Sequence, residues 1–305
     1  KSVNAEKVGT WLAFGERTEF MKSRNMLISI LITFVFSCTY SISDDAALAS
    51  AVTFMNTEIA AADIVKIVFS VQIQGNLTNA DANDDWISIG SGFFTAMTNN
   101  VLLGVTCNHV VASAQKSGKD IFIGLDTTDG YMRSPCSLVY ADNANDIAIL
   151  KPLKRADITA LVQNLPASIS VMDADDSARE GQGLLITGYP LGLGIEDNRN
   201  HPVVRFGMVA QNAGNNTVLI DGIANHGNSG SPVFRIKYKA HKLVGMITSH
   251  VVDRITLLDE NGQLSAQLPY NSGLSRAIKA TFIIEALEVA NTILEGKDAE
   301  QGDED

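Results

Sequence analysis

The segment Gly227-Asn228-Ser229-Gly230-Ser231-Pro232 places a serine between two glycines. A serine hydroxyl can attack a carbonyl carbon where the backbone bends sharply and presents the hydroxyl beside its own N–H group. Gly227 permits such a bend because it has no Cβ. The N–H groups of Gly227 and Ser229 would then form an oxyanion hole, which contributes roughly 3–4 kcal/mol per donor. The alternative is an ordinary turn serine.

A serine is a poor nucleophile until a base takes its proton. Among the five histidines, His109 is the one that follows an apolar run, residues 101–106, and lies at its polar end. Asp146 directly precedes another apolar run, residues 147–150, and its carboxylate would fix the tautomer of the imidazole. Taken singly, each has a structural alternative, a core histidine or a turn aspartate. In the order His, Asp, Ser they predict nucleophilic acyl transfer by Ser229.

Short β-rich runs separated by Gly, Asn and Asp fill the chain between about residues 60 and 275. Regular short strands with turn signals are typical of barrels and sandwiches. Two groups of about six runs predict an all-β fold of two six-stranded antiparallel β-barrels, at about 60–155 and 180–275, within a domain that spans 60–294. The runs are 64–73, 86–95, 101–106, 121–125, 137–140 and 147–150, and then 184–187, 203–209, 217–220, 232–237 and 242–249.

A helix is predicted after the second barrel, at 275–294. Its apolar residues recur at i, i+4, i+7 and i+11, which places them on one helical face. They are Ile283, Leu287, Ala290 and Leu294. Residues 295–305 hold six acids and one lysine, and this charge predicts a solvated, disordered tail.

The sequence of the amino-terminal region predicts a targeting segment rather than a part of the fold. Residues 1–20 are expected to be an upstream, non-native segment before Met21. From there, a basic flank (Lys22 and Arg24), the apolar stretch 27–38 and a small polar exit predict a secretory signal over 21–49. The apolar stretch is too short for a membrane span, which needs about 20 residues. A buried helix is the alternative.

Export would place the protein in the periplasm or outside the cell. The segment Val35-Phe36-Ser37-Cys38 resembles a lipoprotein cleavage site, which would make Cys38 a lipid anchor, whereas ordinary cleavage would fall near Ser43 or Ala49. An oxidising compartment would allow Cys107 and Cys136 to pair. We expect two buried thiols instead.

The composition excludes several classes of protein. The 46% hydrophobic and 19% charged residues rule out wholesale disorder. The net charge is −11 and no dense Lys/Arg cluster occurs, so we expect no nucleic-acid partner. The three cysteines are widely spaced and form no zinc pattern, and no metal or cofactor is expected.

Together these segments resemble the trypsin fold, and within it the HtrA-type (Deg-like) bacterial serine endopeptidases. The likeness runs in register over about 64–290. The matching segments are Gly90-Ser91-Gly92-Phe93, Thr106 to Val111, Asp146 to Leu150, Glu180-Gly181 with Gly188 to Gly192, Phe206 to Val209, Gly227 to Pro232 and Gly273 to Ile278.

The resemblance implies a serine endopeptidase that acts on proteins or peptides. His109 would be the general base and acid, Asp146 its orienting partner and Ser229 the nucleophile, with the oxyanion hole at Gly227 and Ser229. Thr248 lies where the fold often has a hydroxyl that contacts the buried aspartate, although a plain strand threonine is the alternative.

The resemblance also implies a pocket for the side chain before the scissile bond, P1. Its expected lining residues are Ile223, Ala224, His226, Ile247, Thr248 and Ser249. No Asp lies at the pocket base, which disfavours Lys or Arg at P1, and Ile223 and Ile247 favour a small or medium apolar P1. His226 and His250 leave an acidic P1 open, and Ser231 is also found in glutamyl endopeptidases of the same fold.

Three further expectations come from this likeness. Asn228 stands where digestive relatives have Asp, so activation by a new α-ammonium is not expected. A PDZ module, usual after HtrA protease domains, is expected to be absent, and trimers are common among relatives. The competing hypotheses are a protease-fold binding module that no longer cleaves and a purely structural β protein.

Overall fold

The structure, a computed structural model, describes residues 61–74, 86–96, 101–127, 130–153, 169–174, 178–196, 199–212, 214, 216–235 and 241–302. The expected upstream segment 1–20, the signal 21–49 and the possible anchor Cys38 lie outside these residues. In the part of the chain that is described, no helix has both the length and the apolar character required to cross a membrane.

The first barrel is closed by six antiparallel strands in the order β1-β2-β3-β6-β5-β4. The strands are β1 (Val68–Gln74), β2 (Trp86–Ala96), β3 (Leu102–Cys107), β4 (Ile121–Thr127), β5 (Gly130–Asp142) and β6 (Ile147–Pro152). All six residues of β3 are buried. The run expected from Ile64 begins as strand at Val68, because the 3-10 turn η3 (Val65–Ile67) precedes it. After β3 comes a helix that was not predicted, α3 (Asn108–Lys116).

The second barrel has the strand order β13-β8-β11-β12-β15-β14 and is closed by the pairing of β13 with β14. Its strands are β8 (Gly183–Gly188), β11 (Val203–Gln211), β12 (Thr217–Asp221), β13 (Pro232–Arg235), β14 (His241–Leu258) and β15 (Leu264–Lys279). A further strand, β7 (Ile169–Ala174), pairs in parallel with the start of β14. Short pieces η4 (Pro190–Gly192), β9 (Ile195–Glu196) and β10 (Arg199–Asn200) connect β8 to β11. The predicted pair of six-stranded antiparallel barrels with a C-terminal helix is confirmed.

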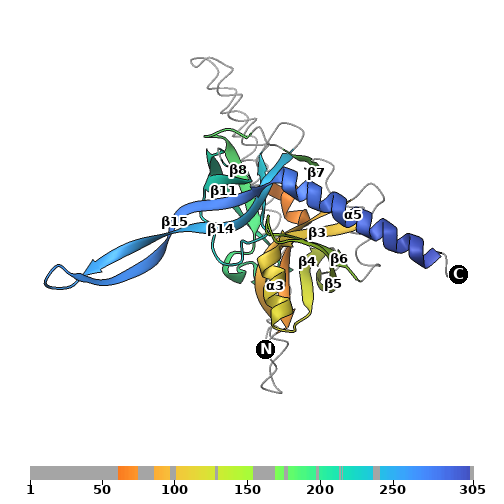
Figure 1. Cartoon of the computed structure of the whole chain (residues 1–305), viewed down its shortest axis with the longest axis horizontal. Coiled ribbons are helices and arrows are strands. Elements are labelled where there is room, and N and C mark those ends of the chain that lie inside the picture. Colours follow the sequence, from red (N-terminus) through yellow and green to blue (C-terminus); the bar gives the residue numbers. More distant parts are fainter. Residues whose placement is uncertain are drawn as a thin grey trace, which may run out of the picture. The chain divides into compact units, whose positions relative to one another are not determined.

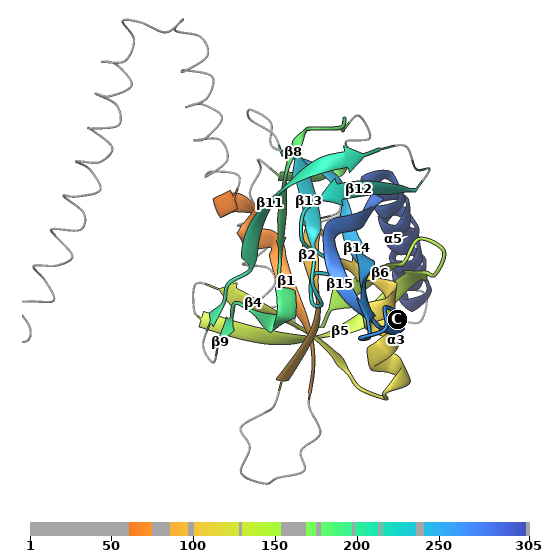
Figure 2. The same ribbon diagram turned by 90° about the vertical axis from the view of Figure 1, so that its left-hand side faces the viewer.

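The C-terminal helix α5 spans Ala280–Gly302 and begins later than the expected residue 275. The reason is that residues 274–278 pair with β12 and extend β15. The helix also continues past residue 295, where a disordered tail was expected. Its predicted apolar stripe faces the protein, with Ile283, Leu287 and Ala290 fully buried. Through this stripe α5 packs against β5, β6 and β14 (Figures 1 and 2).

Two clusters of buried side chains hold the barrels together. The larger cluster contains the interior of the first barrel, the stripe of α5 and outward-facing residues of the second barrel. The smaller one fills the interior of the second barrel. On β14, Met246 belongs to the larger cluster and Ile247 to the smaller one. This strand therefore runs along the junction between the barrels.

Strands β14 and β15 continue together well beyond the second barrel as a two-stranded ribbon (Figure 1). The pairing runs from Val252 opposite Asn271 to Leu258 opposite Leu264. A tight turn closes it, in which the N–H of Gly262 donates to the carbonyl of Asp259 over 3.0 Å. The strand predicted over 242–249 is therefore only the first part of β14, and the extension to Leu258 was not predicted.

Candidate active site

His109 and Asp146 come from the ends of two neighbouring strands of the first barrel. Because β3 and β6 pair with Cys107 opposite Ile147, the first turn of α3, which follows β3 and contains His109, lies beside Asp146, the residue before β6. Nδ1 of His109 lies 2.7 Å from Oδ2 of Asp146, and the backbone N–H of His109 donates to Oδ1 over 2.8 Å. Asp146 has a φ of 57°, a conformation that Asp adopts more readily than most residues. The carboxylate therefore fixes both the ring and the backbone of the histidine.

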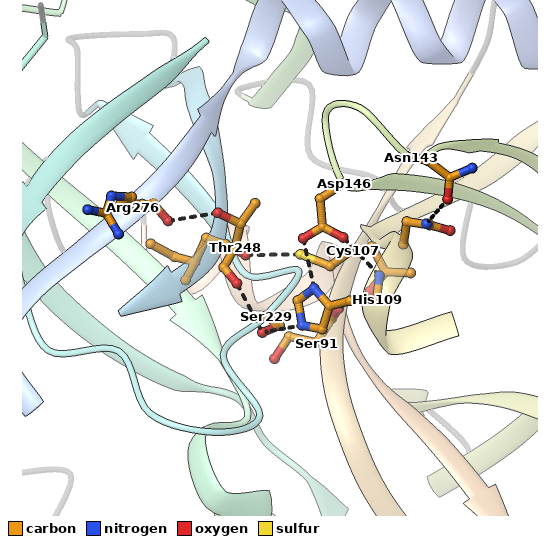
Figure 3. A network of polar contacts seen from close by, with 11 residues as sticks. Ser91, Cys107, His109, Asn143, Asp146, Ser229, Thr248 and Arg276 are labelled. Atoms are coloured by element: carbon orange, nitrogen blue, oxygen red, sulfur yellow. Dashed lines mark hydrogen bonds and ion pairs between the residues drawn. The ribbon is translucent and has the colours of Figure 1, made fainter. Parts of the chain in front are cut away.

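Ser229 reaches the opposite side of the same imidazole from the second barrel (Figure 3). Its Oγ lies 3.0 Å from Nε2 of His109. In the neutral tautomer in which Nδ1 donates to the carboxylate, Nε2 carries no proton and can accept the serine proton. The side chains of His109 and Asp146 are 50% and 31% exposed, so a substrate can reach the group. The structure thus brings together the three residues that the sequence singled out, in the arrangement that general-base activation of a hydroxyl requires.

The peptide between His226 and Gly227 is oriented as an oxyanion hole needs. The carbonyl of His226 accepts a hydrogen bond from the N–H of Leu191 over 2.5 Å, so the N–H of Gly227, on the other side of this trans peptide, points the opposite way. Gly227 has a φ of 89°, and the backbone of Tyr189 and Leu191 fills the space that a Cβ would need. Within the described part of the chain, no hydrogen bond uses the N–H of Gly227 or of Ser229. Both donors are therefore available to a substrate oxygen.

Ser91 of β2, for which no role was predicted, connects the nucleophile loop to the first barrel by hydrogen bonds. Its N–H donates to the carbonyl of Ser229 over 2.8 Å, and its hydroxyl donates to the carbonyl of Gly227 over 2.6 Å. The same hydroxyl accepts the N–H of Tyr189 over 2.8 Å. Gly230, with a φ of 93°, leaves no room for a Cβ against the Ser91 carbonyl. The signal in the sequence is the segment Gly90-Ser91-Gly92, in which a serine lies between two glycines.

Cys107 lies behind the carboxylate of Asp146 and was also not predicted at the site. Its thiol donates to the carbonyl of Ile247 over 3.2 Å and is fully buried. Burial, followed by the negative charge of Asp146, raises the pKa of Cys107 well above its usual range, so the thiol stays protonated.

Cys107, His109 and Asp146 also form the group of potential metal ligands found among the described residues, with their ligand atoms within 4.8 Å of one another. In this arrangement the imidazole and the carboxylate are already bonded to each other. Cys107 and Cys136 do not form a disulfide. Cys107 is buried, as predicted, whereas Cys136 is only partly buried. Burial of the thiol nevertheless raises the pKa of Cys136 to about 12, although a hydrogen bond with the backbone of Ile123 opposes this shift.

The residues expected to line the P1 pocket fall into two groups. Ile223 is 55% exposed, His226 and Ser249 are also exposed, and Thr248 is partly buried. Ala224 and Ile247 are buried in the interior of the second barrel. The Ile247 side chain belongs to the core of the second barrel, whereas that of the preceding Met246 belongs to the larger cluster, and a role of Ile247 in the pocket stays a prediction. Ile247 serves the site through its backbone, whose carbonyl accepts the N–H of Gly230 over 2.8 Å.

The expected contact between the Thr248 hydroxyl and Asp146 is not made. That hydroxyl donates to the carbonyl of Arg276 over 3.4 Å. The register of β14 against β15 shifts between Ile247 and Ser249, and such a bulge turns the extra residue away from its regular direction. The carbonyl of Thr248 instead lies 3.5 Å from the Ser229 hydroxyl.

Comparison with family models identifies the family of this chain. The model of the trypsin-like peptidase domain matches residues 90–246, just over half of the chain, and the chain belongs to this family. Among solved structures, a serine endoprotease from Yersinia pestis is similar at 22% identity and a TM-score of 0.49, over 78% of this chain and 67% of that one. The HtrA-type protease AlgW, solved with a decapeptide, is similar at 21% identity and a TM-score of 0.49, over 77% of this chain and 67% of that one. No curated protein matches the chain significantly.

Proposed function

We propose that this protein is a serine endopeptidase that hydrolyses peptide bonds through an acyl-enzyme. The observation that carries the proposal is the continuous set of contacts from Asp146 through His109 to Ser229, with distances of 2.7 and 3.0 Å. The family supports a peptidase acting on protein substrates. The geometry supports a hydroxyl activated by an oriented imidazole.

The proposed reaction needs no group beyond the chain and water. Ser229 Oγ forms a bond to the carbonyl carbon while its proton moves to Nε2 of His109. The resulting oxyanion accepts hydrogen bonds from the N–H groups of Gly227 and Ser229. His109 then donates that proton to the amine nitrogen as the C–N bond breaks. Water then attacks the ester carbon while His109 takes its proton, and His109 returns a proton to Ser229 Oγ as the ester C–O bond breaks. Asp146 is not protonated in either step.

We propose a small or medium apolar P1 side chain. The exposed side chain of Ile223 supports it, together with the lack of a carboxylate in the segments 223–226 and 247–250. Ile247, the second residue expected to favour an apolar P1, is buried in the core of the second barrel. A specific observation favours an acidic P1 as the other candidate, because the rings of His226 and His250 lie 6.0 Å apart, edge to face, beside the nucleophile loop.

The test is hydrolysis of a peptide library by purified protein, with Ser229→Ala as the control. We expect cleavage by the wild type, with P1 read from the new carboxyl termini, and none by the control. A preference for Glu or Asp that is lost in His226→Gln would establish the second candidate. Tight peptide binding without cleavage by the wild type would show a catalytically silent binding module instead.

We also propose that the protein is exported through the segment 21–49, on the support of the sequence pattern alone. The mass of the protein isolated from its producing cell tests this. A mature chain that begins near residue 43 or 49 would show ordinary cleavage, a diacylated Cys38 would show a lipid anchor, and an intact segment in the cytoplasm would contradict export.

A further inference from the structure

The ribbon formed by residues 251–272 of β14 and β15 has one apolar and one polar face. Directly opposed residues of an antiparallel pair point to the same side. One face thus carries three opposed pairs, Asp253–Tyr270, Ile255–Leu268 and Leu257–Ala266, and we call it the apolar face. The other face carries Val252–Asn271, Arg254–Pro269 and Thr256–Gln267, and the Arg254 guanidinium donates to the Gln267 side chain over 3.4 Å.

The apolar face lies open to solvent. Ile255 and Leu268 are each 51% exposed, Tyr270 is 43% exposed and Leu257 is 42% exposed. Seven of the sixteen exposed large hydrophobic residues in the described part of the chain belong to the ribbon: these four, Leu258 and Leu264 in the last pair before the turn, and Val252, which lies on the other face. A contiguous apolar patch marks an interaction site, and a two-stranded ribbon by itself is marginally stable. A third strand would extend the sheet beside the apolar patch and stabilise the ribbon.

The free edge of the ribbon starts at the nucleophile. Along the side of β14 that faces β13, Pro232 pairs with Met246, and the next residue, Ile247, exchanges hydrogen bonds with Gly230 and Ser231. Thr248 then presents its carbonyl to the Ser229 hydroxyl. From Ser249 to Leu258 this edge has no strand partner within the described residues. An extended chain whose scissile carbonyl lies at Ser229 can therefore continue along it.

We propose that an extended polypeptide substrate adds to this edge as a third strand, so that residues far from the scissile bond are recognised by the ribbon. The inference rests on the proposed function, because it requires the substrate carbonyl to lie at Ser229. Antiparallel pairing is the commoner and slightly more stable arrangement. A chain antiparallel to β14 runs toward Ser229, which places the residues before the scissile bond on the ribbon.

The chemistry of the ribbon defines the substrate class. Backbone hydrogen bonds give affinity in strand addition, and alternate side chains give specificity. Here alternate substrate residues would lie beside Ile255 and Leu257 and extend the apolar face. The preferred substrate is an unfolded segment with apolar residues at every second position and no proline. Asp259 and Glu260 at the tip make an anionic membrane surface a poor partner.

The test compares two peptides with the same residues around the scissile bond. One has four residues before the bond, and the other has twelve with alternating apolar side chains. We expect kcat/KM for the long peptide to exceed that for the short one by roughly tenfold, since several cross-strand pairs contribute together. The double variant Ile255→Thr/Leu268→Thr should lose this ratio and keep the short-peptide rate. The matched control on the polar face, Thr256→Ser/Gln267→Thr, should keep both.

Three outcomes would overturn the inference. One is an equal kcat/KM for both peptides with normal cleavage of the short one, and another is an equal advantage from residues added after the scissile bond. The third is a change of sedimentation mass in the Ile255→Thr/Leu268→Thr variant without a change in the ratio, which would assign the face to a second copy of the chain. If neither peptide is cleaved, the proposed function fails, and binding of both peptides to Ser229→Ala by fluorescence anisotropy still decides whether the ribbon holds the long one.

Discussion

The two barrels contribute to the candidate active site in different ways. The first barrel supplies both His109, in the first turn of α3 directly after β3, and Asp146, directly before β6, and the pairing of β3 with β6 brings these two segments together. The second barrel supplies Ser229 from a loop that the first barrel fastens through Ser91. The imidazole–carboxylate pair is therefore a property of one barrel, whereas the serine–imidazole distance depends on the junction between two.

Because of this difference, we expect some substitutions to disturb the orientation of His109 and others to disturb the position of Ser229. A change to Asp146 should alter the chemistry and leave the fold intact. A change to Ser91 should loosen the junction. A polar group buried within a single barrel should affect stability and leave catalysis unchanged.

The largest effect is expected for Asp146→Asn. An amide at this position can hold the wrong tautomer of His109, which leaves Nε2 protonated and unable to accept the serine proton. We expect kcat for a short peptide to fall by about 10⁴-fold, while the melting temperature stays close to that of the wild type. A fall of less than tenfold would show that the carboxylate does not orient the base.

A smaller effect is expected for Ser91→Ala, which removes the hydroxyl that bonds to both Gly227 and Tyr189. Displacement of reacting groups by about 1 Å can cost about 10²-fold in rate, and we expect a loss of this order in kcat together with lower stability. Ser70→Ala is the matched control, because the Ser70 hydroxyl is also buried and donates to the Gly124 carbonyl within the first barrel. Similar losses of kcat in the two variants, at equal fractions folded, would contradict a special role of the junction.

The smallest effect concerns stability against pH and arises at His241, a buried residue at the start of β14. Burial lowers the pKa of His241 below its usual 6.5, although the charge of Asp63 opposes this shift. The unfolded chain therefore binds a proton more readily than the folded one, and the free energy of unfolding should fall as the pH drops below 6.5. In His241→Gln this part of the pH dependence should be absent from denaturant titrations. If the free energy of unfolding of this variant falls between pH 6.5 and 5 as steeply as that of the wild type, the pH dependence arises from other groups.

The proposed catalytic residues could be predicted from the sequence because each lies where its local chain pattern changes. Asp146 and His109 flank apolar strands, and Ser229 lies between glycines. Ser91 and Cys107 could not be given roles in this way. Their contacts with Gly227 and Ile247 cross the junction between the barrels, and no local pattern records which residues meet there.

The substrate side of the site was predicted less well for a related reason. Strand β14 lies between two cores and buries the successive side chains of Met246 and Ile247 on opposite sides, so the sequence pattern of this strand does not show which of its side chains face a substrate. The ribbon did carry local signals, since the alternation of residues 264, 266, 268 and 270 and the Asn261-Gly262 turn are typical of a hairpin. They were missed because nothing in the sequence requires a strand to leave its barrel.

Labelling with a fluorophosphonate probe tests the central claim most directly, because the probe forms a bond only with an activated serine. We predict that peptide mapping of the labelled wild type finds the adduct on Ser229, that Ser229→Ala takes up no label, and that His109→Ala, folded to the same extent, is labelled far more slowly. An unlabelled wild type, with and without added peptide, or an adduct at another serine would contradict the account.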